Sequence, residues 1–174
     1  LTTLLLLPFT RLLEKLAVLT IRDKKSVQGE DEDVPVVAVL DSRFLLSPSL
    51  ALSHVKEVVE QMGEYAKKNF VRSVSMFEKF DPARKERIMN FEDAIDQMED
   101  KLNRYLVELT NSELSEQDSQ TITYYLKLIM EFERIGDYSI NLVEFAENME
   151  STGAEFSPQA QFELTTIGEA VKEA

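Results

Sequence analysis

The sequence predicts an all-α protein built around an elongated, antiparallel three-helix bundle. Two observations support this fold class. Five glycines and five prolines, ten in all among 174 residues, favour long helices over many short strands joined by turns. Apolar residues recur every three or four positions along most of the chain, as on the buried face of an amphipathic helix. A hydrophobic content of 44% is enough for one core of ordinary size.

The first 21 residues are rich in leucine and leave two interpretations open. Their uninterrupted apolar start, LTTLLLLPF, is far shorter than the roughly 20 residues that cross a bilayer. The segment is either the trailing end of a membrane helix or an ordinary amphipathic helix. Its spacing favours the amphipathic helix, with Leu5, Phe9, Leu12, Leu16 and Leu19 on one face.

Residues 22–46 connect this segment to the bundle. RDKKSVQGEDEDV (22–34) is charged and typical of a linker. VPVVAVLDSRFLL (34–46) is apolar and rich in β-branched residues, but the sequence offers no second strand to pair with it. We therefore expect an extended strap that lies against the helices.

Capping signals divide residues 47–151 into three helices. Ser47-Pro48 and Asp81-Pro82 each place a capping residue before a proline at the first helical position. The first helix is expected to run to about residue 80, and the second to about residue 109.

The third helix begins with Ser115 and Asp118, which resemble a capping box, and is expected to run to about Met149. Ser157-Pro158 then opens a further helix over residues 157–174. That helix has the same texture as residues 52–66, which is compatible with the start of a second repeat or with a generic amphipathic helix.

Each of the three long helices has one apolar face, and the short connections between them require antiparallel neighbours. The predicted core residues are Val55, Val58, Met62, Ala66, Phe70, Val74 and Phe77 in the first helix, Ile88, Phe91, Ile95, Met98, Leu102, Tyr105, Leu106 and Leu109 in the second, and Ile122, Tyr125, Leu126, Ile129, Ile140 and Val143 in the third.

Composition excludes several function classes. A net charge of −13 repels phosphate backbones, so we expect no nucleic acid partner. The absence of cysteine excludes thiolate chemistry, and one histidine, His54, excludes a multi-His zinc site. The sequence has no Gly-x-Ser-x-Gly elbow and no Gly-rich phosphate loop. We expect a protein that is not an enzyme.

Two pairs of carboxylates stand out on the second and third helices. Glu92 and Asp96 are four residues apart, as are Glu133 and Asp137, so each pair projects from one helix face. Both pairs are equally far from the turn predicted at residues 112–115. Because residues equidistant from the turn of an antiparallel hairpin lie side by side, we expect four carboxylates at one level.

Such a cluster needs protons, basic partners or a bound cation, since two charges 4 Å apart repel by about 4 kcal/mol at an effective dielectric constant near 20. Arg104 and Arg134 are candidate partners, although Arg134 follows Glu133 directly and points to another face. Oxygen ligands suit magnesium, manganese, calcium or iron. Gly136 would allow close approach of the helices or leave room for an ion.

The alternative is that both pairs are simply solvated. The chain has 32 acidic residues, so acidic pairs at this spacing arise by chance, as Asp96 and Asp100 illustrate.

The same residues carry a resemblance to a known family. ERIGDYSINLVE (133–144) resembles the signature third helix of the PhoU family, the regulators of phosphate uptake, and NFEDAIDQMEDKLNRYL (90–106) resembles the matching second helix. The resemblance implies three-helix-bundle repeats with a Glu/Asp-x-x-x-Asp motif on each of two helices. In several members these motifs bind iron, zinc or other divalent ions.

Carried over by resemblance, the metal ligands are Glu92, Asp96, Glu133 and Asp137. Asn141 and Glu144 also match the family pattern, whereas Tyr138 stands where the family often has histidine. The expected ion is divalent or trivalent: iron, manganese, magnesium, zinc or calcium.

A second resemblance covers LTTLLLLPFTRLLEKL (1–16) and VAVLDSRFLLSPSLALSHVKEVVEQMGEYA (37–66). These stretches are similar to bacterial sodium/phosphate cotransporter-like membrane proteins with a C-terminal PhoU domain. The resemblance implies that the leucine-rich start is the tail of the last membrane helix.

The sequence therefore predicts a non-enzymatic regulatory domain at the cytoplasmic face of a bacterial membrane. Its expected partners are the transporter domain of the same polypeptide and a second copy of the chain. The alternative function is a helical oligomerisation module with no metal site.

Overall fold

The computed structural model describes residues 35–37 and 39–173, so the predictions for residues 1–21 and for the charged linker lie outside the described residues. The chain divides into two units, Leu1–Asp33 and Val34–Ala174, and the second holds everything described below. Its elements are a 3-10 helix η1 (Ser42–Leu46) and the helices α2 (Pro48–Ser75), α3 (Pro82–Leu109), α4 (Glu116–Thr152) and α5 (Pro158–Glu173). The described residues form no strand, which confirms the all-α fold.

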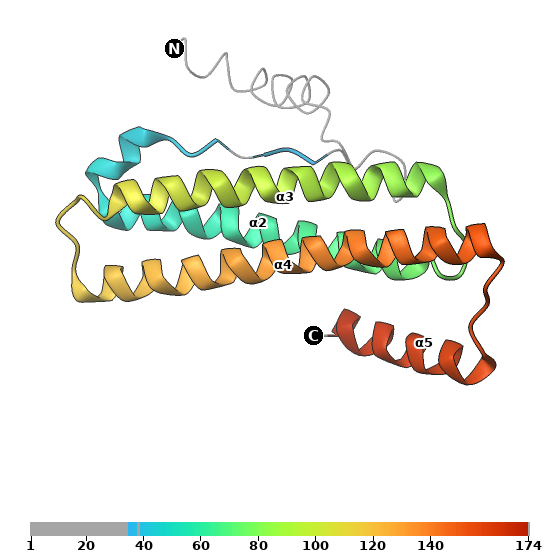
Figure 1. The fold of residues 1–174 in the computed structure, drawn as a ribbon. Helices are drawn as coiled ribbons and strands as arrows, with labels where there is room; N and C mark the ends of the chain where they lie inside the picture. Colours follow the sequence, from blue (N-terminus) through green and yellow to red (C-terminus); the bar gives the residue numbers. More distant parts are fainter. Residues whose placement is uncertain (1–34, 38, 174) are drawn as a thin grey trace, which may run out of the picture. The chain divides into compact units, whose positions relative to one another are not determined.

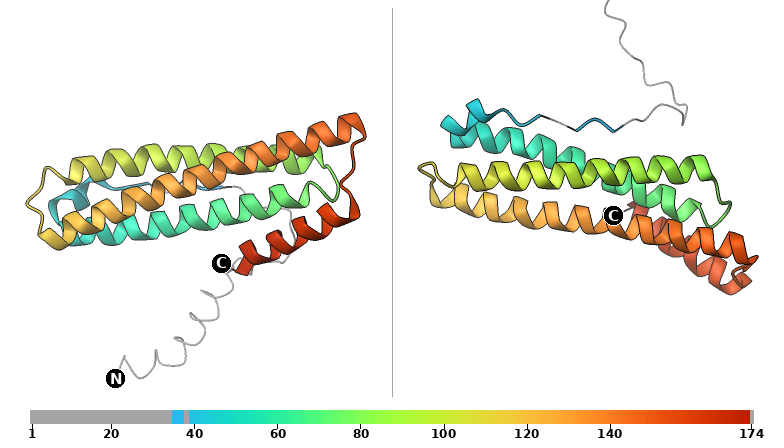
Figure 2. Two further views of the ribbon diagram at one scale, coloured as in Figure 1. Left: turned by 60° about the horizontal axis from the view of Figure 1, so that its bottom comes forward. Right: turned by 45° about the horizontal axis from the view of Figure 1, so that its top comes forward.

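Helices α2, α3 and α4 form the antiparallel bundle that the sequence predicts (Figures 1 and 2). Each helix contacts the other two along its length, and α2 and α4 share the most extensive contact. Helix α5 turns back after α4 and touches the end of α2. None of the described helices is long and apolar enough to span a bilayer.

Local capping chemistry sets the helix starts. Asp81 accepts a hydrogen bond from the backbone N–H of Ala83 at 2.9 Å, with Pro82 at the first helical position. Ser115 and Asp118 form both hydrogen bonds of a capping box. Ser47, by contrast, makes no side-chain capping bond, so at α2 the proline alone marks the start.

Two helix ends differ from the predictions. Helix α2 ends at Ser75, earlier than expected, because Asp81 is extended before Pro82 and the chain needs the intervening residues to reverse direction. Helix α4 runs to Thr152 and ends at Gly153, whose φ of 66° is the left-handed conformation that glycine adopts at little cost.

The core confirms the predicted face of α3 completely and that of α2 in part. All eight α3 residues named above are buried. In α2, the prediction holds through Ala66 and then fails, because Asn69, Ser73 and Met76 occupy the buried face. The predicted residues Phe70, Val74 and Phe77 are only half-buried.

A second apolar contact explains this shift in α2. The ring of Phe77 packs against Phe145 at 5.9 Å and Phe156 at 5.5 Å between centroids. Val74 lies beside Gly168 of α5. Val74 and Phe77 thus face α5, the end of α4 and Phe156, and the bundle interior receives Asn69, Ser73 and Met76 instead.

Residues 35–37 and 39–41 carry no helix and, with η1, lie along α2 and α3 as a strap (Figure 1). The carbonyl of Val36 accepts hydrogen bonds from Gln61 and the Tyr65 hydroxyl, both at 3.2 Å. The Tyr105 hydroxyl donates to the Asp41 carbonyl at 3.1 Å. The strap was predicted, but the 3-10 helix within it was not.

Candidate functional site

The four predicted carboxylates lie along the seam between α3 and α4. Glu92 and Asp96 project from α3, and Glu133 and Asp137 project from α4. Gly136 of α4 is buried against Ile95 of α3, and a Cβ built on Gly136 would lie 3.5 Å from the Ile95 side chain. Because Ile95 stands between Glu92 and Asp96 and Gly136 between Glu133 and Asp137, this contact puts the two pairs at the same level of the seam.

The charges that act on Glu92 come from both helices. Its carboxyl is half-buried, and its pKa is raised to about 7. Desolvation is the largest cause, followed by the negative charges of Asp96, Asp93, Asp137 and Glu133, in that order. Three of these four charges belong to the predicted cluster, hereafter the acidic tetrad (Glu92, Asp96, Glu133 and Asp137).

Two other members of the tetrad are perturbed in the same direction. Desolvation raises the pKa of Asp96, and the charge of Asp137 across the seam is the next cause. Desolvation also raises the pKa of Glu133, followed by the charge of Asp137, which also makes a side-chain hydrogen bond to it. The charges that act on these carboxyls are negative, so protons or a bound cation would relieve the repulsion.

The two arginines considered as partners are engaged elsewhere. Arg134 pairs with Glu131 at 3.2 Å, and Arg104 pairs with Asp100 at 2.7 Å. Asp100, four residues after Asp96, still adds to the negative charge that raises the pKa of Asp96. Neither arginine neutralises the seam.

The tetrad has the donor set for a cation but not the arrangement of a finished site. In the described part of the chain, no three Asp, Glu or His side chains converge closely enough to hold a metal ion. Carboxylate oxygens are the ligands that magnesium, manganese, calcium and iron accept. Asp96 and Asp137 are exposed, and Glu92 and Glu133 are half-buried, so all four carboxyls reach solvent.

Sequence reasoning missed two acidic residues that act on the tetrad. Asp93 raises the pKa of Glu92 and of Asp96, and Glu99 raises that of Glu133. Glu99 had a detectable signal, since it stands seven residues after Glu92 and therefore on the same stripe of α3. Asp93 is adjacent in sequence and carries no such signal.

The remaining residues of the family pattern lie further along α4. Asn141 and Glu144 are exposed, and Tyr138 has an exposed fraction of 56%. They are placed on the outside of the bundle rather than in its core.

The fold and the seam define an acidic helical-bundle domain whose distinguishing feature is a pair of carboxylate motifs on two adjacent helices. The sequence matches the family described as PhoU domain over residues 59–146, just over half of the chain. The chain therefore belongs to the PhoU family. No curated protein and no solved structure matches it.

The matched region begins within α2 and ends within α4, so it contains all four residues of the tetrad. Membership in this family points to a phosphate-related regulatory role rather than a catalytic one.

Proposed function

We propose that this chain is a regulatory domain of a phosphate-transporter-like membrane protein and binds a divalent or trivalent metal ion through Glu92, Asp96, Glu133 and Asp137. One observation carries the metal site. Four carboxylates stand at one level of the α3–α4 seam, and desolvation followed by their mutual repulsion raises the pKa of three of them.

The four metal ligands would come from two helices. Glu92 and Asp96 would supply ligands from α3, and Glu133 and Asp137 would supply them from α4. A bound iron, manganese, magnesium, zinc or calcium ion would supply the positive charge that the seam lacks. By holding carboxylates of both helices, the site would favour one arrangement of α3 against α4.

The membrane context is supported by the resemblance of residues 1–16 and 37–66 to cotransporter-like proteins. In this proposal the domain lies at the cytoplasmic face of a bacterial membrane, and its partner is the transporter domain of the same polypeptide. That partner would respond to the arrangement of α3 and α4, so that occupancy of the seam modulates phosphate transport or signalling.

Metal content of the purified protein tests the site. The variant Glu133→Ala/Asp137→Ala removes one pair, and Glu60→Ala/Glu64→Ala is a matched control with the same spacing and charge change on α2. We expect bound metal in the wild type and the control, and none in the seam variant. Equal metal content in all three proteins would reject the site.

Phosphate uptake in cells that express the full-length polypeptide tests the regulatory role. The seam variant should change the response of uptake to external phosphate, whereas the α2 control should not. A seam variant that binds no metal and yet regulates uptake normally would separate metal binding from regulation.

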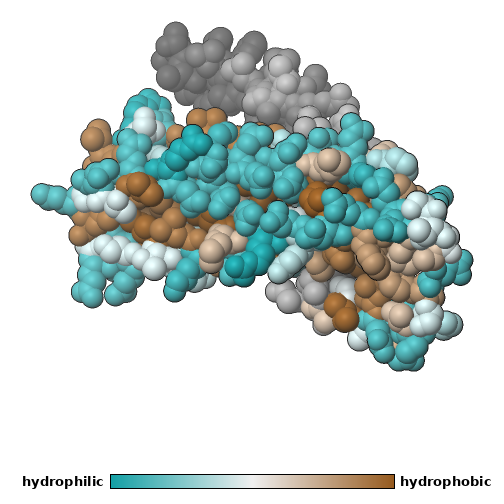
Figure 3. Space-filling view, viewed as in Figure 1, coloured by the Kyte–Doolittle hydropathy of each residue, from teal (hydrophilic) through white to brown (hydrophobic). Residues whose placement is uncertain are grey.

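A second function, helical oligomerisation without a metal site, is favoured by exposed apolar residues. Phe145, Phe162 and Ile167 have exposed fractions of 55, 70 and 61%, and Figure 3 shows a hydrophobic area over α5. The mass of the protein in solution, with and without residues 1–20, distinguishes the two functions. A metal-free dimer that becomes a monomer on truncation supports assembly.

A further inference from the structure

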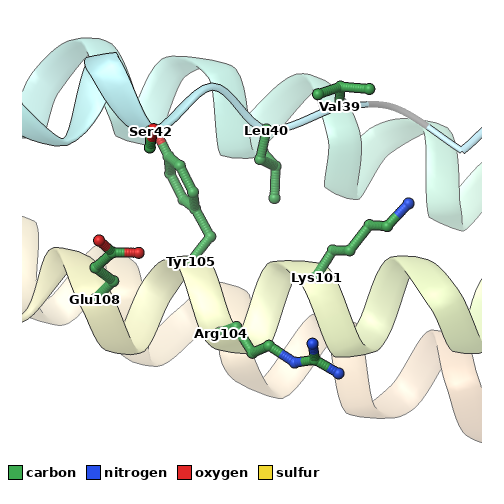
Figure 4. A pocket seen from close by; sticks show the side chains of 7 residues that line it. All are labelled: Val39, Leu40, Ser42, Lys101, Arg104, Tyr105 and Glu108. Carbon is green, nitrogen blue, oxygen red and sulfur yellow. The ribbon is translucent and has the colours of Figure 1, made fainter.

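A groove of about 310 Å³ lies between the strap and α3, away from the acidic tetrad (Figure 4). Its volume is at the lower end of the range of about 300–1,000 Å³ found for small-molecule sites. The lining residues come from two segments far apart in sequence: Val39, Leu40 and Ser42 from the strap, and Lys101, Arg104, Tyr105 and Glu108 from α3.

The middle of the groove is apolar and held in place. Leu40 points from the strap toward α3, and the ring of Tyr105 rises from α3 toward the strap (Figure 4). The hydroxyl of Tyr105 donates to the Asp41 carbonyl at 3.1 Å, which joins the two walls. An apolar group placed here would contact both walls.

The two ends of the groove differ in charge. Lys101 extends toward the end formed by Val39 and makes no ion pair with any described residue, while Glu108 lies at the opposite end near Ser42 (Figure 4). Arg104 points away from the strap and pairs with Asp100. A ligand with one negative end is therefore directed toward Lys101 by attraction and away from Glu108 by repulsion.

We propose that this groove binds a small oxyanion that carries an apolar body, with the oxyanion at Lys101 and the body against Leu40 and Tyr105. A carboxylate and a phosphate monoester share this chemistry. Because the chain has a net charge of −13, free inorganic phosphate is repelled, and the apolar contact supplies the attraction that phosphate lacks.

Binding in this groove would be linked to docking of the strap. Both walls exist only while residues 39–42 lie against α3, so a ligand that needs both walls stabilises the docked strap. The strap is the stretch of chain that joins the bundle to residues 1–34. The groove would thus sense a small anion independently of the acidic tetrad.

Titration of the full chain by ¹H–¹⁵N NMR tests the proposal. The probes are phenyl phosphate and phenylacetate. Inorganic phosphate is the control that lacks the apolar body, and benzyl alcohol is the control that lacks the charge. We expect saturable shifts at residues 39–42 and 101–108 with one or both aromatic anions, and the tighter of the two identifies the oxyanion. Neither control should bind as tightly.

Two lysine variants isolate the charged end. Lys101→Gln should weaken binding by about fivefold, the equivalent of about 1 kcal/mol, without changing the circular dichroism spectrum. Lys127→Gln removes an exposed lysine of α4 and should bind like the wild type. The proposal is overturned if neither aromatic anion binds at the groove, if Lys101→Gln binds as tightly as the wild type, or if inorganic phosphate binds as well as phenyl phosphate.

Discussion

The α3–α4 seam has two levels with opposite electrostatic designs. Toward the start of α3, the amino group of Lys85 lies 2.6 Å from a carboxylate oxygen of Glu147 on α4, a complementary pair. At the tetrad, the same two helices bring only carboxylates together, and the pKa of Glu92 rises to about 7.

The comparison shows that the seam does not force like charges together. The same two helices carry the Lys85–Glu147 ion pair at one level. A lysine or arginine on either helix could therefore neutralise the carboxylates at the other level. The tetrad instead combines desolvation with repulsion, a combination that concentrates at functional sites. We interpret the tetrad as the level of the seam that binds a ligand, and the Lys85–Glu147 pair as a level that only stabilises the fold.

The largest expected effect is stabilisation by metal at the tetrad. At a Mn²⁺ concentration one hundred times the Kd, the wild type should gain about 2.7 kcal/mol of unfolding free energy. That gain corresponds to a rise in Tm of about 5–10 °C. The variant Lys85→Met/Glu147→Gln lacks the ion pair at the other level of the seam and should show the same rise in Tm in a thermal melt. If the rise disappeared in this variant, the ion would bind near Lys85 and Glu147 and not at the tetrad.

The next effect is a pH dependence of the metal-free protein. Since the pKa of Glu92 is about 7 in the folded state and 4.5 normally, the folded state keeps a proton that the unfolded state loses between these values. The stability it contributes is fully present below pH 4.5 and is lost as pH rises toward 7. Allowing for solvent screening of a half-exposed group, we expect a loss of about 1 kcal/mol.

Denaturant melts from pH 4.5 to 8 measure this dependence. Glu92→Gln should flatten it and should exceed the wild type in stability at pH 8 without metal. The isosteric control Glu147→Gln, at the other level of the seam, should keep the slope. A wild type whose stability rises with pH across this window would contradict the assignment.

Gly136 offers a smaller and less intuitive effect. The sequence suggested that Gly136 allows close approach of the helices or leaves room for an ion, but a Cβ there would lie 3.5 Å from Ile95, an ordinary contact. Gly136→Ala should therefore raise the stability by up to about 1 kcal/mol through helix propensity. Gly63→Ala is the contrasting case, because its Cβ would lie 2.9 Å from the Phe132 ring. Chemical denaturation of both variants should show opposite signs.

The smallest effect belongs to the Lys85–Glu147 pair. Both side chains are partly exposed, with fractions of 30 and 47%. A double-mutant cycle should therefore give a coupling of about 0.5 kcal/mol that declines at high salt. A coupling above about 2 kcal/mol would mean that this level, too, is more than a surface ion pair.

The sequence predicted most of the helix framework because helix starts depend on local chemistry. Asp81-Pro82 and the Ser115–Asp118 capping box need no tertiary partner to be recognised. The face of α3 was also recoverable from its spacing. The end of α2 was not, since Phe70, Val74 and Phe77 form an apolar stripe whichever neighbour they face.

The position of the tetrad was predictable from the sequence, but the desolvation and raised pKa values of its carboxyls were not. Equal distances from one turn placed Glu92 and Asp96 beside Glu133 and Asp137, which needs only antiparallel geometry. The extent of desolvation depends on packing around each carboxyl, as does the contribution of Asp93. These are tertiary properties that spacing does not encode.

Calorimetric titration of Mn²⁺ into the metal-free protein at pH 8 and pH 5.5 tests the central claim most directly. We predict saturable binding at pH 8, weaker binding at pH 5.5 because protons occupy Glu92, and no binding by Glu133→Ala/Asp137→Ala at either pH. The matched Glu60→Ala/Glu64→Ala control should bind like the wild type. Absence of heat in the wild type at pH 8, or equal binding by the seam variant, would contradict the metal site.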